Sequence, residues 1–229
     1  MSNYTHHNKM SSHFGYAIGE KGNEVDVITN NGARFGDIES GNYTEFESDG
    51  TIRFKGDATV WNDLPPNPII RSRTPSSNNP TLATFKGNID QYRFAVNDYV
   101  SDNFEIMHEY KEGTDLVMHI HWANNGEETA EKFVKWELEY TIANAFDEFS
   151  EPITISGEFS VPASTPDRTH FVSGIGVIGG EDLKIGAVIS YNIKRIASEG
   201  NAPAVNPFGL QVAPHIQIDT VGSRQIFTK

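Results

Sequence analysis

A strict alternation of apolar and polar side chains constrains the fold of this chain more than any other feature. In residues 134–142 the apolar side chains Val134, Trp136 and Leu138 alternate with charged ones, and the alternation continues through Tyr140 and Ile142. Because successive side chains of a β-strand point to opposite faces, this period of two predicts a strand with one buried and one solvated face. The pattern recurs in residues 183–193 and 210–218. Such strands bury their apolar faces when two sheets close face to face.

Shorter segments of similar character extend this pattern along most of the chain. They are residues 51–55, 92–97, 104–110, 115–122, 153–161 and 170–178. Turn sequences such as Ser48-Asp49-Gly50 separate them, because Gly and Asp accept turn conformations. About nine or ten strands at this spacing predict an all-β fold, an antiparallel β-sandwich of jelly-roll-like type. The best candidate for a helix is residues 141–149, and it would have at most a turn or two.

The first 45 residues have a different composition from the rest. They are rich in Gly, Asn and Ser, and their apolar residues, among them Phe14, Tyr16 and Ile18, are too sparse to form a core. Such a segment becomes ordered mainly by contact with another molecule. We therefore expect short strands or an extended N-terminal arm over residues 1–45, with Phe14, Tyr16 and Ile18 as contact residues, followed by the sandwich over residues 46–229. A disordered leader is the alternative.

Composition excludes several classes of partner and site. The chain carries 18 basic and 31 acidic residues, a formal net charge of −13, which repels phosphate backbones and argues against nucleic-acid binding. It has no cysteine, so disulfides and thiolate metal sites are excluded. Residues 1–10 are polar, and no run approaches the roughly 20 apolar residues of a membrane helix. We therefore predict neither a secretory signal nor a membrane partner.

The HIHW sequence at residues 119–122 is the most conspicuous chemical motif. On a strand, His119 and His121 point to the same side, roughly 6.5–7 Å apart. Such a pair is a candidate metal site if a third ligand joins it. The third ligand would be a carboxylate, His170, His215 or His108, and His108 is the natural partner if its segment forms a hairpin with the HIHW strand. A structural or subunit-interface role for His119 and His121 is the preferred interpretation, and we predict no cofactor.

No sequence motif of an enzyme is present. The chain lacks GxSxG, HExxH, a P-loop and the dinucleotide-binding glycine pattern, so we predict no catalytic residues and no enzyme activity. Of the three tryptophans, Trp122 and Trp136 lie on the apolar faces of their predicted strands and are expected in the core. Trp61 precedes a pair of prolines, and its place is left open.

A Pro/Ser/Asn-rich loop at residues 65–80 carries Arg71 and Arg73, the densest positive charge in this acidic chain. They are candidate interface residues that would pair with carboxylates of a neighbouring molecule, and a solvated loop is the alternative. An open sandwich must also protect its edge strands. Association as a homotrimer is one way to do so.

Several blocks of sequence, taken in order, resemble uncharacterised structural proteins of tailed phages. They are EFESDGTIRFKGDATVWNDL at residues 45–64, HEYKEGTD at 108–115 followed by HIHW at 119–122, WELEY at 136–140 and QIDTVGSRQ at 217–225. The similarity covers approximately residues 42–229. The chain departs from the family pattern at Met118, where Pro is frequent, and at Pro65-Pro66, where a longer apolar strand is usual.

The resemblance implies a virion protein with a β-sandwich fold, a capsid decoration or head-fibre protein on the outer surface of the particle. Such a protein would be made in the host cytoplasm. Its partners would be copies of itself and, through the N-terminal arm, the major capsid protein or another virion protein. The alternatives are a tail-fibre or receptor-binding domain that recognises a host surface glycan, and a cupin-like metal-binding protein. The resemblance supplies no catalytic residues.

Overall fold

The computed structural model describes residues 16–20, 23–29, 32–64, 67–68, 78–223, 225–226 and 228. These residues form antiparallel sheets, and the one helical element among them is a short 3-10 turn, η1 (Gly56–Ala58), so the all-β prediction is confirmed. Among the same residues, no helix has the length and apolar character that crossing a membrane requires. Phe14, Arg71 and Arg73 lie outside the described residues.

The chain divides into two compact units. The first contains residues 1–62 together with 107–111 and 217–229, and the second contains residues 63–106 and 112–216. The expected boundary after residue 45 differs from this division, because residue 45 lies inside a strand of the first unit. Residues 46–62 therefore belong with the N-terminal segment and not with the sandwich.

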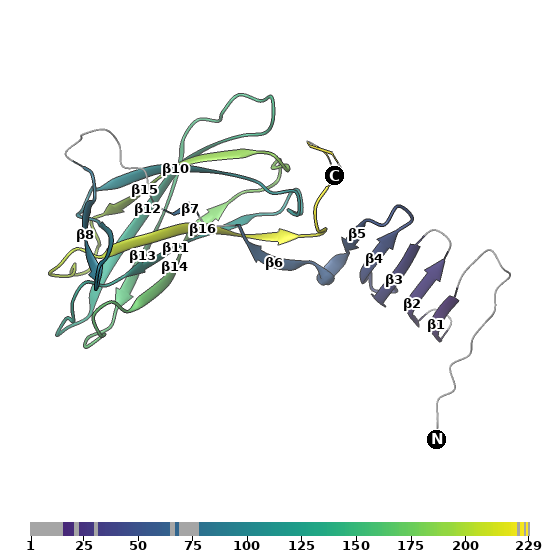
Figure 1. Cartoon of the computed structure of the whole chain (residues 1–229), viewed down its shortest axis with the longest axis horizontal. Helices are drawn as coiled ribbons and strands as arrows, with labels where there is room; N and C mark the ends of the chain where they lie inside the picture. The colour runs from purple at the N-terminus through teal and green to yellow at the C-terminus, as the bar shows by residue number, and fades with distance from the viewer. Residues whose placement is uncertain are drawn as a thin grey trace, which may run out of the picture. The chain divides into compact units, whose positions relative to one another are not determined.

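The first unit contains a five-stranded antiparallel sheet in which each described strand pairs with the next (Figure 1). Its strands are β1 (Tyr16–Glu20), β2 (Asn23–Thr29), β3 (Gly32–Asp37), β4 (Asn42–Glu47) and β5 (Ile52–Phe54). The backbone of Tyr16 and Ile18 thus lies in β1, whereas the contacts of their side chains fall outside the described structure. Short strands, an extended arm or a disordered leader were expected for residues 1–45, and the described part of this segment forms short strands.

Gly32 illustrates why this segment is rich in glycine. Its φ of +137° is a conformation that L side chains rarely adopt, and a Cβ at this position would lie 2.0 Å from the Phe46 carbonyl oxygen. Only glycine therefore allows β3 to begin this close to β4.

Two later segments complete the first unit beside β5. The Phe54 amide donates to the Asp219 carbonyl at 2.7 Å, and the Asp219 amide donates to the Glu109 carbonyl at 3.2 Å. The Lys111 amide in turn donates to the Gln217 carbonyl at 2.7 Å. Backbone hydrogen bonds therefore join parts of the chain that lie more than 100 residues apart in sequence.

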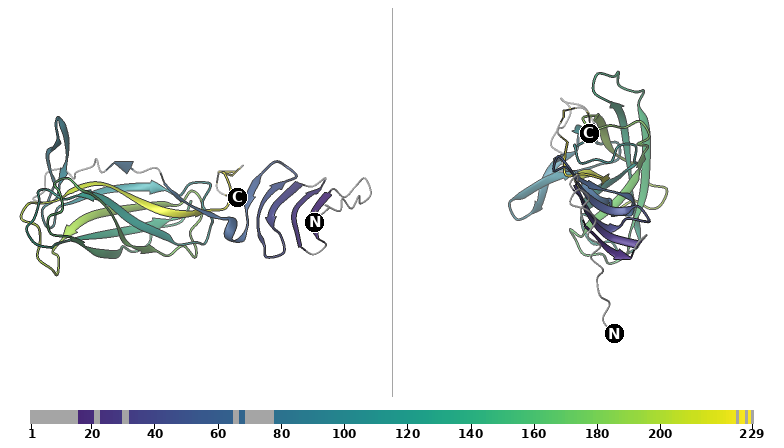
Figure 2. Two further views of the ribbon diagram at one scale, coloured as in Figure 1. Left: turned by 90° about the horizontal axis from the view of Figure 1, so that it is seen from below. Right: turned by 90° about the vertical axis from the view of Figure 1, so that its right-hand side faces the viewer.

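The second unit is a β-sandwich of two antiparallel sheets (Figures 1 and 2). In the described residues, one sheet has the order β10-β15-β12-β13, and the other follows the path β14-β11-β16-β9-β8, with β7 also paired to β16. The strands of the first sheet are β10 (Tyr99–Glu105), β12 (Lys132–Ala143), β13 (Ile153–Val161) and β15 (Val188–Ile196). Those of the second are β7 (Asn67–Pro68), β8 (Thr81–Lys86), β9 (Ile89–Arg93), β11 (Leu116–Ala123), β14 (His170–Ile178) and β16 (Phe208–Ile218). Strand β6 (Val60–Asp63) spans the division between the units.

The core of the sandwich lies where the apolar faces of the two sheets meet. Trp122 from β11 and Trp136 from β12 are both fully buried, with ring centroids 6.4 Å apart, as their places on the alternating strands predict. Phe94 meets Trp136 edge-on at 5.3 Å, and Phe171 stacks on Trp122 at 4.6 Å. Trp61, by contrast, is 54% exposed in the first unit.

Four expectations about secondary structure are wrong. The strand expected at residues 92–97 stops early because β9 ends at Arg93, and the strand expected at residues 104–110 stops early because β10 ends at Glu105. The helix expected at residues 141–149 does not form, because β12 continues to Ala143, and Ile142 pairs with Ile189 on β15. The strand expected from residue 183 begins only at Val188. Leu183 and Ile185 are nevertheless buried. Alternating burial therefore extends beyond the hydrogen-bonded strand.

Candidate functional site

His119 and His121 lie on the face of β11 that points away from the sandwich core. Leu116, Met118 and Ile120 alternate with them and are fully buried in the core, as the period of two predicts. His119 is itself only 3% exposed, whereas His121 is half-buried. The two imidazoles approach each other, with 3.1 Å between their Nε2 atoms.

Neighbouring strands add two more histidines, and we call the four residues His119, His121, His170 and His215 the histidine row. Strand β11 lies between β14 and β16, which carry His170 and His215. The Nδ1 atom of His121 is 2.9 Å from Nε2 of His170, and these two rings are nearly parallel, with 5.1 Å between their centroids. His215 stacks on His119 at 4.3 Å.

The hairpin expected to bring His108 to this row does not form. The partners of β11 are β14 and β16, and the segment that carries His108 is not one of them. His108 instead belongs to the first unit, where its Nδ1 is hydrogen-bonded to the Ser223 hydroxyl. The sequence places His119 and His121 on one face but does not reveal which strands lie beside them.

Three members of the histidine row, His119, His121 and His170, form a hydrogen-bonded chain. His121 directs Nε2 to His119 and Nδ1 to His170, so its two neighbours approach opposite sides of one ring. A metal site instead requires ligand atoms that converge on one point. Among the described residues, no group of three or more His, Asp or Glu side chains is placed to hold a metal ion.

His121, in the middle of the chain of imidazoles, should contribute more to stability than His170 at its end. We expect His121→Ala to lower the free energy of unfolding by about 1–2 kcal/mol, because it removes two hydrogen bonds, one of them to the buried His119. His170→Ala removes one bond from an exposed residue and should cost less. Urea denaturation of the two variants tests this order, and a larger loss for His170→Ala would contradict it.

A second candidate is a polar hollow of about 510 Å³ on the outer face of the four-stranded sheet. Tyr99 and Ser101 of β10, Asn192 and Lys194 of β15, and Glu137 and Glu139 of β12 line it, together with Asn78 and Asn97. Register explains why they gather: Tyr99 pairs with Lys194, Lys194 with Glu137, and Asn192 with Glu139. Residues far apart in sequence thus form one polar surface.

Hydrogen bonds between the side chains organise the polar hollow. Asn192 accepts from the Ser101 hydroxyl at its carbonyl oxygen and donates from its amide nitrogen to Glu139 at 3.0 Å. The Lys194 ammonium lies 3.4 Å from a Glu137 carboxylate oxygen. The hollow therefore presents donors and acceptors that are already held in place by rigid strands.

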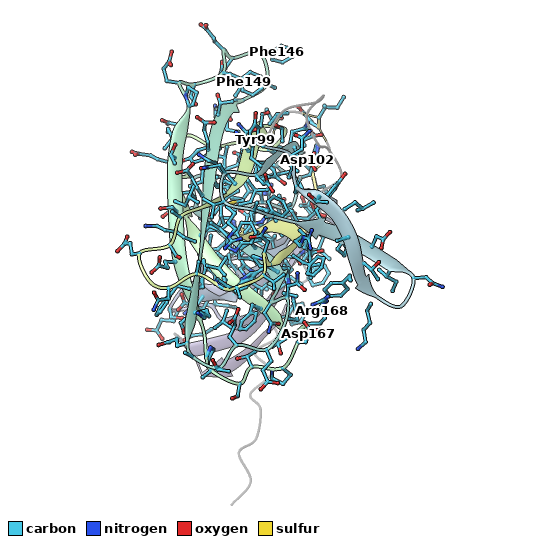
Figure 3. The ribbon with its side chains drawn as sticks, turned by 90° about the vertical axis from the view of Figure 1, so that its left-hand side faces the viewer. Tyr99, Asp102, Phe146, Phe149, Asp167 and Arg168 are labelled. Atoms are coloured by element: carbon cyan, nitrogen blue, oxygen red, sulfur yellow. The ribbon has the colours of Figure 1, made fainter. Side chains whose placement is uncertain are left out.

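A smaller hollow of about 220 Å³ adjoins it and shares Ser101, Glu139 and Asn192. Tyr191 also lines this second hollow. Burial raises the pKa of the Tyr191 phenol, and the nearby Asp102 carboxylate adds to the shift. Tyr99 and Asp102 are labelled in Figure 3.

The third candidate is the apolar face of the N-terminal sheet. Across β3, β4 and β5, Ala33 pairs with Phe46 and Phe46 with Ile52, while Phe35 pairs with Thr44 and Thr44 with Phe54. These six residues are the apolar face. Phe35 and Phe46 meet edge-on at 5.9 Å, yet each remains 41% exposed.

The opposite face of β3–β5 carries the ion pairs. Arg34 forms an ion pair with Glu45 at 2.7 Å, and Lys55 lies 3.8 Å from the same carboxylate. The hydrogen bond to Glu45 raises the pKa of the Arg34 guanidinium. Exposed ion pairs of this kind contribute only about 0–1 kcal/mol each to stability. Their main effect is to make this face of the sheet polar.

The loop between β12 and β13 exposes two further aromatic residues that the sequence did not single out as exposed. Phe146 is 91% exposed and Phe149 is 50% exposed, and Figure 3 shows both side chains at one end of the sandwich. Phe146 has a φ of +74°, which is uncommon for a bulky residue and belongs to a tight turn.

Comparison with known proteins adds no family: no protein-family model matches the chain, and no curated protein matches its sequence significantly.

Proposed function

We propose that this chain is a structural protein of a tailed-phage particle, a capsid decoration or head-fibre protein that assembles through its N-terminal sheet. It lies on the outer surface of the virion after synthesis in the host cytoplasm. Its partners are copies of itself and, through the N-terminal segment, the major capsid protein or another virion protein. The role needs no catalysis and no cofactor. The resemblance to phage structural proteins motivates the proposal, and the apolar face carries it.

A sheet with one apolar face is stable when another layer covers that face. Phe35 and Phe46 remain substantially exposed within the described part of one chain, so an additional layer would gain apolar burial there. This is a surface for association.

The charge distribution favours a second copy of the chain as the occupant of the apolar face. The net charge of −13 makes copies of the chain repel one another over most of their surfaces. The six residues of the apolar face carry no charge, and the ion pairs of the sheet lie on its other side. Copies therefore meet at lowest electrostatic cost through the apolar face, and a homotrimer closes this contact around a threefold axis.

Sedimentation equilibrium of the full chain tests the assembly. We expect a particle of three 25.4 kDa chains, and we expect the double variant Phe35→Ser, Phe46→Ser to sediment as a monomer. The matched control is Leu82→Ser, Ile89→Ser, which removes two residues that are each 59% exposed on the sandwich. It should remain trimeric. A monomeric wild-type chain, or equal dissociation of both variants, would contradict the proposal.

Copy number on the particle tests the location. Quantitative mass spectrometry of purified virions that contain the chain should find it in hundreds of copies, as expected for a decoration protein. A handful of copies would favour the tail-fibre alternative, and absence from the particle would refute the structural role altogether.

A further inference from the structure

We infer that the polar hollow on the four-stranded sheet binds an uncharged saccharide. This is a binding activity of the sandwich, separate from the assembly role of the N-terminal sheet. All residues that line the hollow belong to the second unit.

The size of the site suits a small polar ligand. Its volume of about 510 Å³ falls within the range of roughly 300–1,000 Å³ that is typical of ligand sites. The adjoining hollow adds about 220 Å³ and shares three residues with it, so the surface continues across the sheet. Two adjoining hollows accommodate more than one sugar ring.

The lining groups match the chemistry of sugar hydroxyls. Each hydroxyl both donates and accepts, so it is recognised best where donors and acceptors lie side by side. The side-chain amides of Asn78, Asn97 and Asn192 each carry a hydrogen-bond donor and an acceptor. The carboxylates of Glu137 and Glu139 supply further acceptors. Tyr99 adds an aromatic ring, which offers apolar surface to the C–H face of a sugar and a polar tip to its hydroxyls.

The charges of the hollow select against acidic ligands. Two carboxylates, Glu137 and Glu139, face one ammonium, Lys194, which already lies 3.4 Å from Glu137. The net negative charge repels sialic acid, uronic acids, sulfated sugars and phosphate esters. Uncharged hexoses and N-acetylated hexosamines therefore fit this hollow.

The site is also held in its shape before a ligand arrives. Ser101, Asn192 and Glu139 are joined by hydrogen bonds across β10, β15 and β12. Side chains fixed in this way lose little rotamer freedom on binding, which lowers the entropic cost of association.

A glycan array probed with the labelled full-length chain tests the inference. We expect binding to neutral oligosaccharides and none to sialylated, sulfated or uronate-containing ones. Isothermal titration with the best neutral oligosaccharide then measures affinity per chain. Tyr99→Ala and Ser101→Ala should each weaken it by about tenfold, because they remove the ring surface and the hydroxyl that positions Asn192.

The matched control is Ser160→Ala, which changes an exposed serine on β13 of the same sheet outside the hollow. It should bind as the wild type does, and circular dichroism should show all three variants folded. Failure to bind any neutral glycan, a preference for acidic glycans, or equal weakening by Ser160→Ala would overturn the inference. Binding that requires Ca²⁺ and is lost with a chelator would also overturn it, because the carboxylates would then form a cation site.

The outcome of the glycan-binding experiments does not decide the assembly proposal, because the two proposals concern different surfaces and are measured separately. Ser101→Ala should leave the sedimentation of the chain unchanged, and the Phe35→Ser, Phe46→Ser variant should retain its per-chain affinity for the neutral oligosaccharide.

Discussion

Trp122→Ala is expected to lower the free energy of unfolding of the sandwich by about 3–5 kcal/mol. The indole is fully buried, stacks on Phe171 at 4.6 Å and donates from Nε1 to the Ser173 hydroxyl at 2.9 Å. Its removal leaves a cavity between the sheets and deprives the buried Ser173 of this hydrogen bond. Urea denaturation followed by circular dichroism measures the loss.

A comparison with Trp136 separates the hydrogen bond from the packing. Trp136 is equally buried, but among the described residues its Nε1 has no hydrogen-bond partner. Trp136→Phe therefore removes a donor that contributes no bond, whereas Trp122→Phe also breaks the bond to Ser173. We expect Trp122→Phe to cost about 1 kcal/mol more than Trp136→Phe. An equal or reversed order would show that the hydrogen bond does not stabilise the fold.

Arg195→Ala should produce the second large loss, about 3 kcal/mol at neutral pH, because charged hydrogen bonds in a buried site are costly to break. Arg195 lies on β15 and is 2% exposed. Its guanidinium donates to the Phe94 carbonyl at 2.8 Å and to the Asn206 side-chain carbonyl at 2.7 Å. Arg195→Lys should recover only part of the loss, because one ammonium does not reproduce the planar fork.

The loss in Arg195→Ala should also depend on pH, through Asp98. Burial raises the pKa of the Asp98 carboxyl above its ordinary value, and the Arg195 charge opposes that shift. Without Arg195 the pKa of Asp98 rises further. A carboxyl with a raised folded pKa binds its proton more tightly in the folded state, so its contribution to stability falls as the pH rises from the unfolded pKa through the folded one.

The difference in stability between the wild type and Arg195→Ala should therefore be smaller near pH 4 than at pH 7. Urea denaturation at both pH values measures it. A difference that grows toward acid would contradict the role assigned to Asp98.

Arg168 shows how a stabilising residue escapes sequence analysis. Its backbone has a φ of +62°, and its side chain donates to the Phe85 carbonyl at 2.8 Å and to Asn125 at 2.7 Å. The guanidinium lies 4.7 Å from the centre of the Phe208 ring and forms an ion pair with Asp167, beside which it is labelled in Figure 3. Asn125 lies 43 residues from Arg168 along the chain, and Phe85 lies 83 residues from it. No local pattern connects them.

The N-terminal sheet escaped prediction as a sheet for a different reason. Its strands have five to seven residues from β1 to β4 and three in β5, and frequent glycines interrupt any period. Short strands are held by hydrogen bonds to their neighbours, so their apolar alternation extends over too few residues to be distinguished from a loop.

The sequence by itself determined the properties that depend on adjacent residues: the all-β class, the bounds of β13 and β14, the burial of Trp122 and Trp136, and the common face of His119 and His121. These follow from the alternation of side chains along a single strand. Only the tertiary structure decided which strands lie side by side. It joined His170 and His215 to the histidine row, placed His108 in the other unit, and brought Tyr99, Glu137 and Lys194 to one hollow. Strand order and register are set by hydrogen bonds and core contacts between segments far apart in sequence, and no local pattern encodes them.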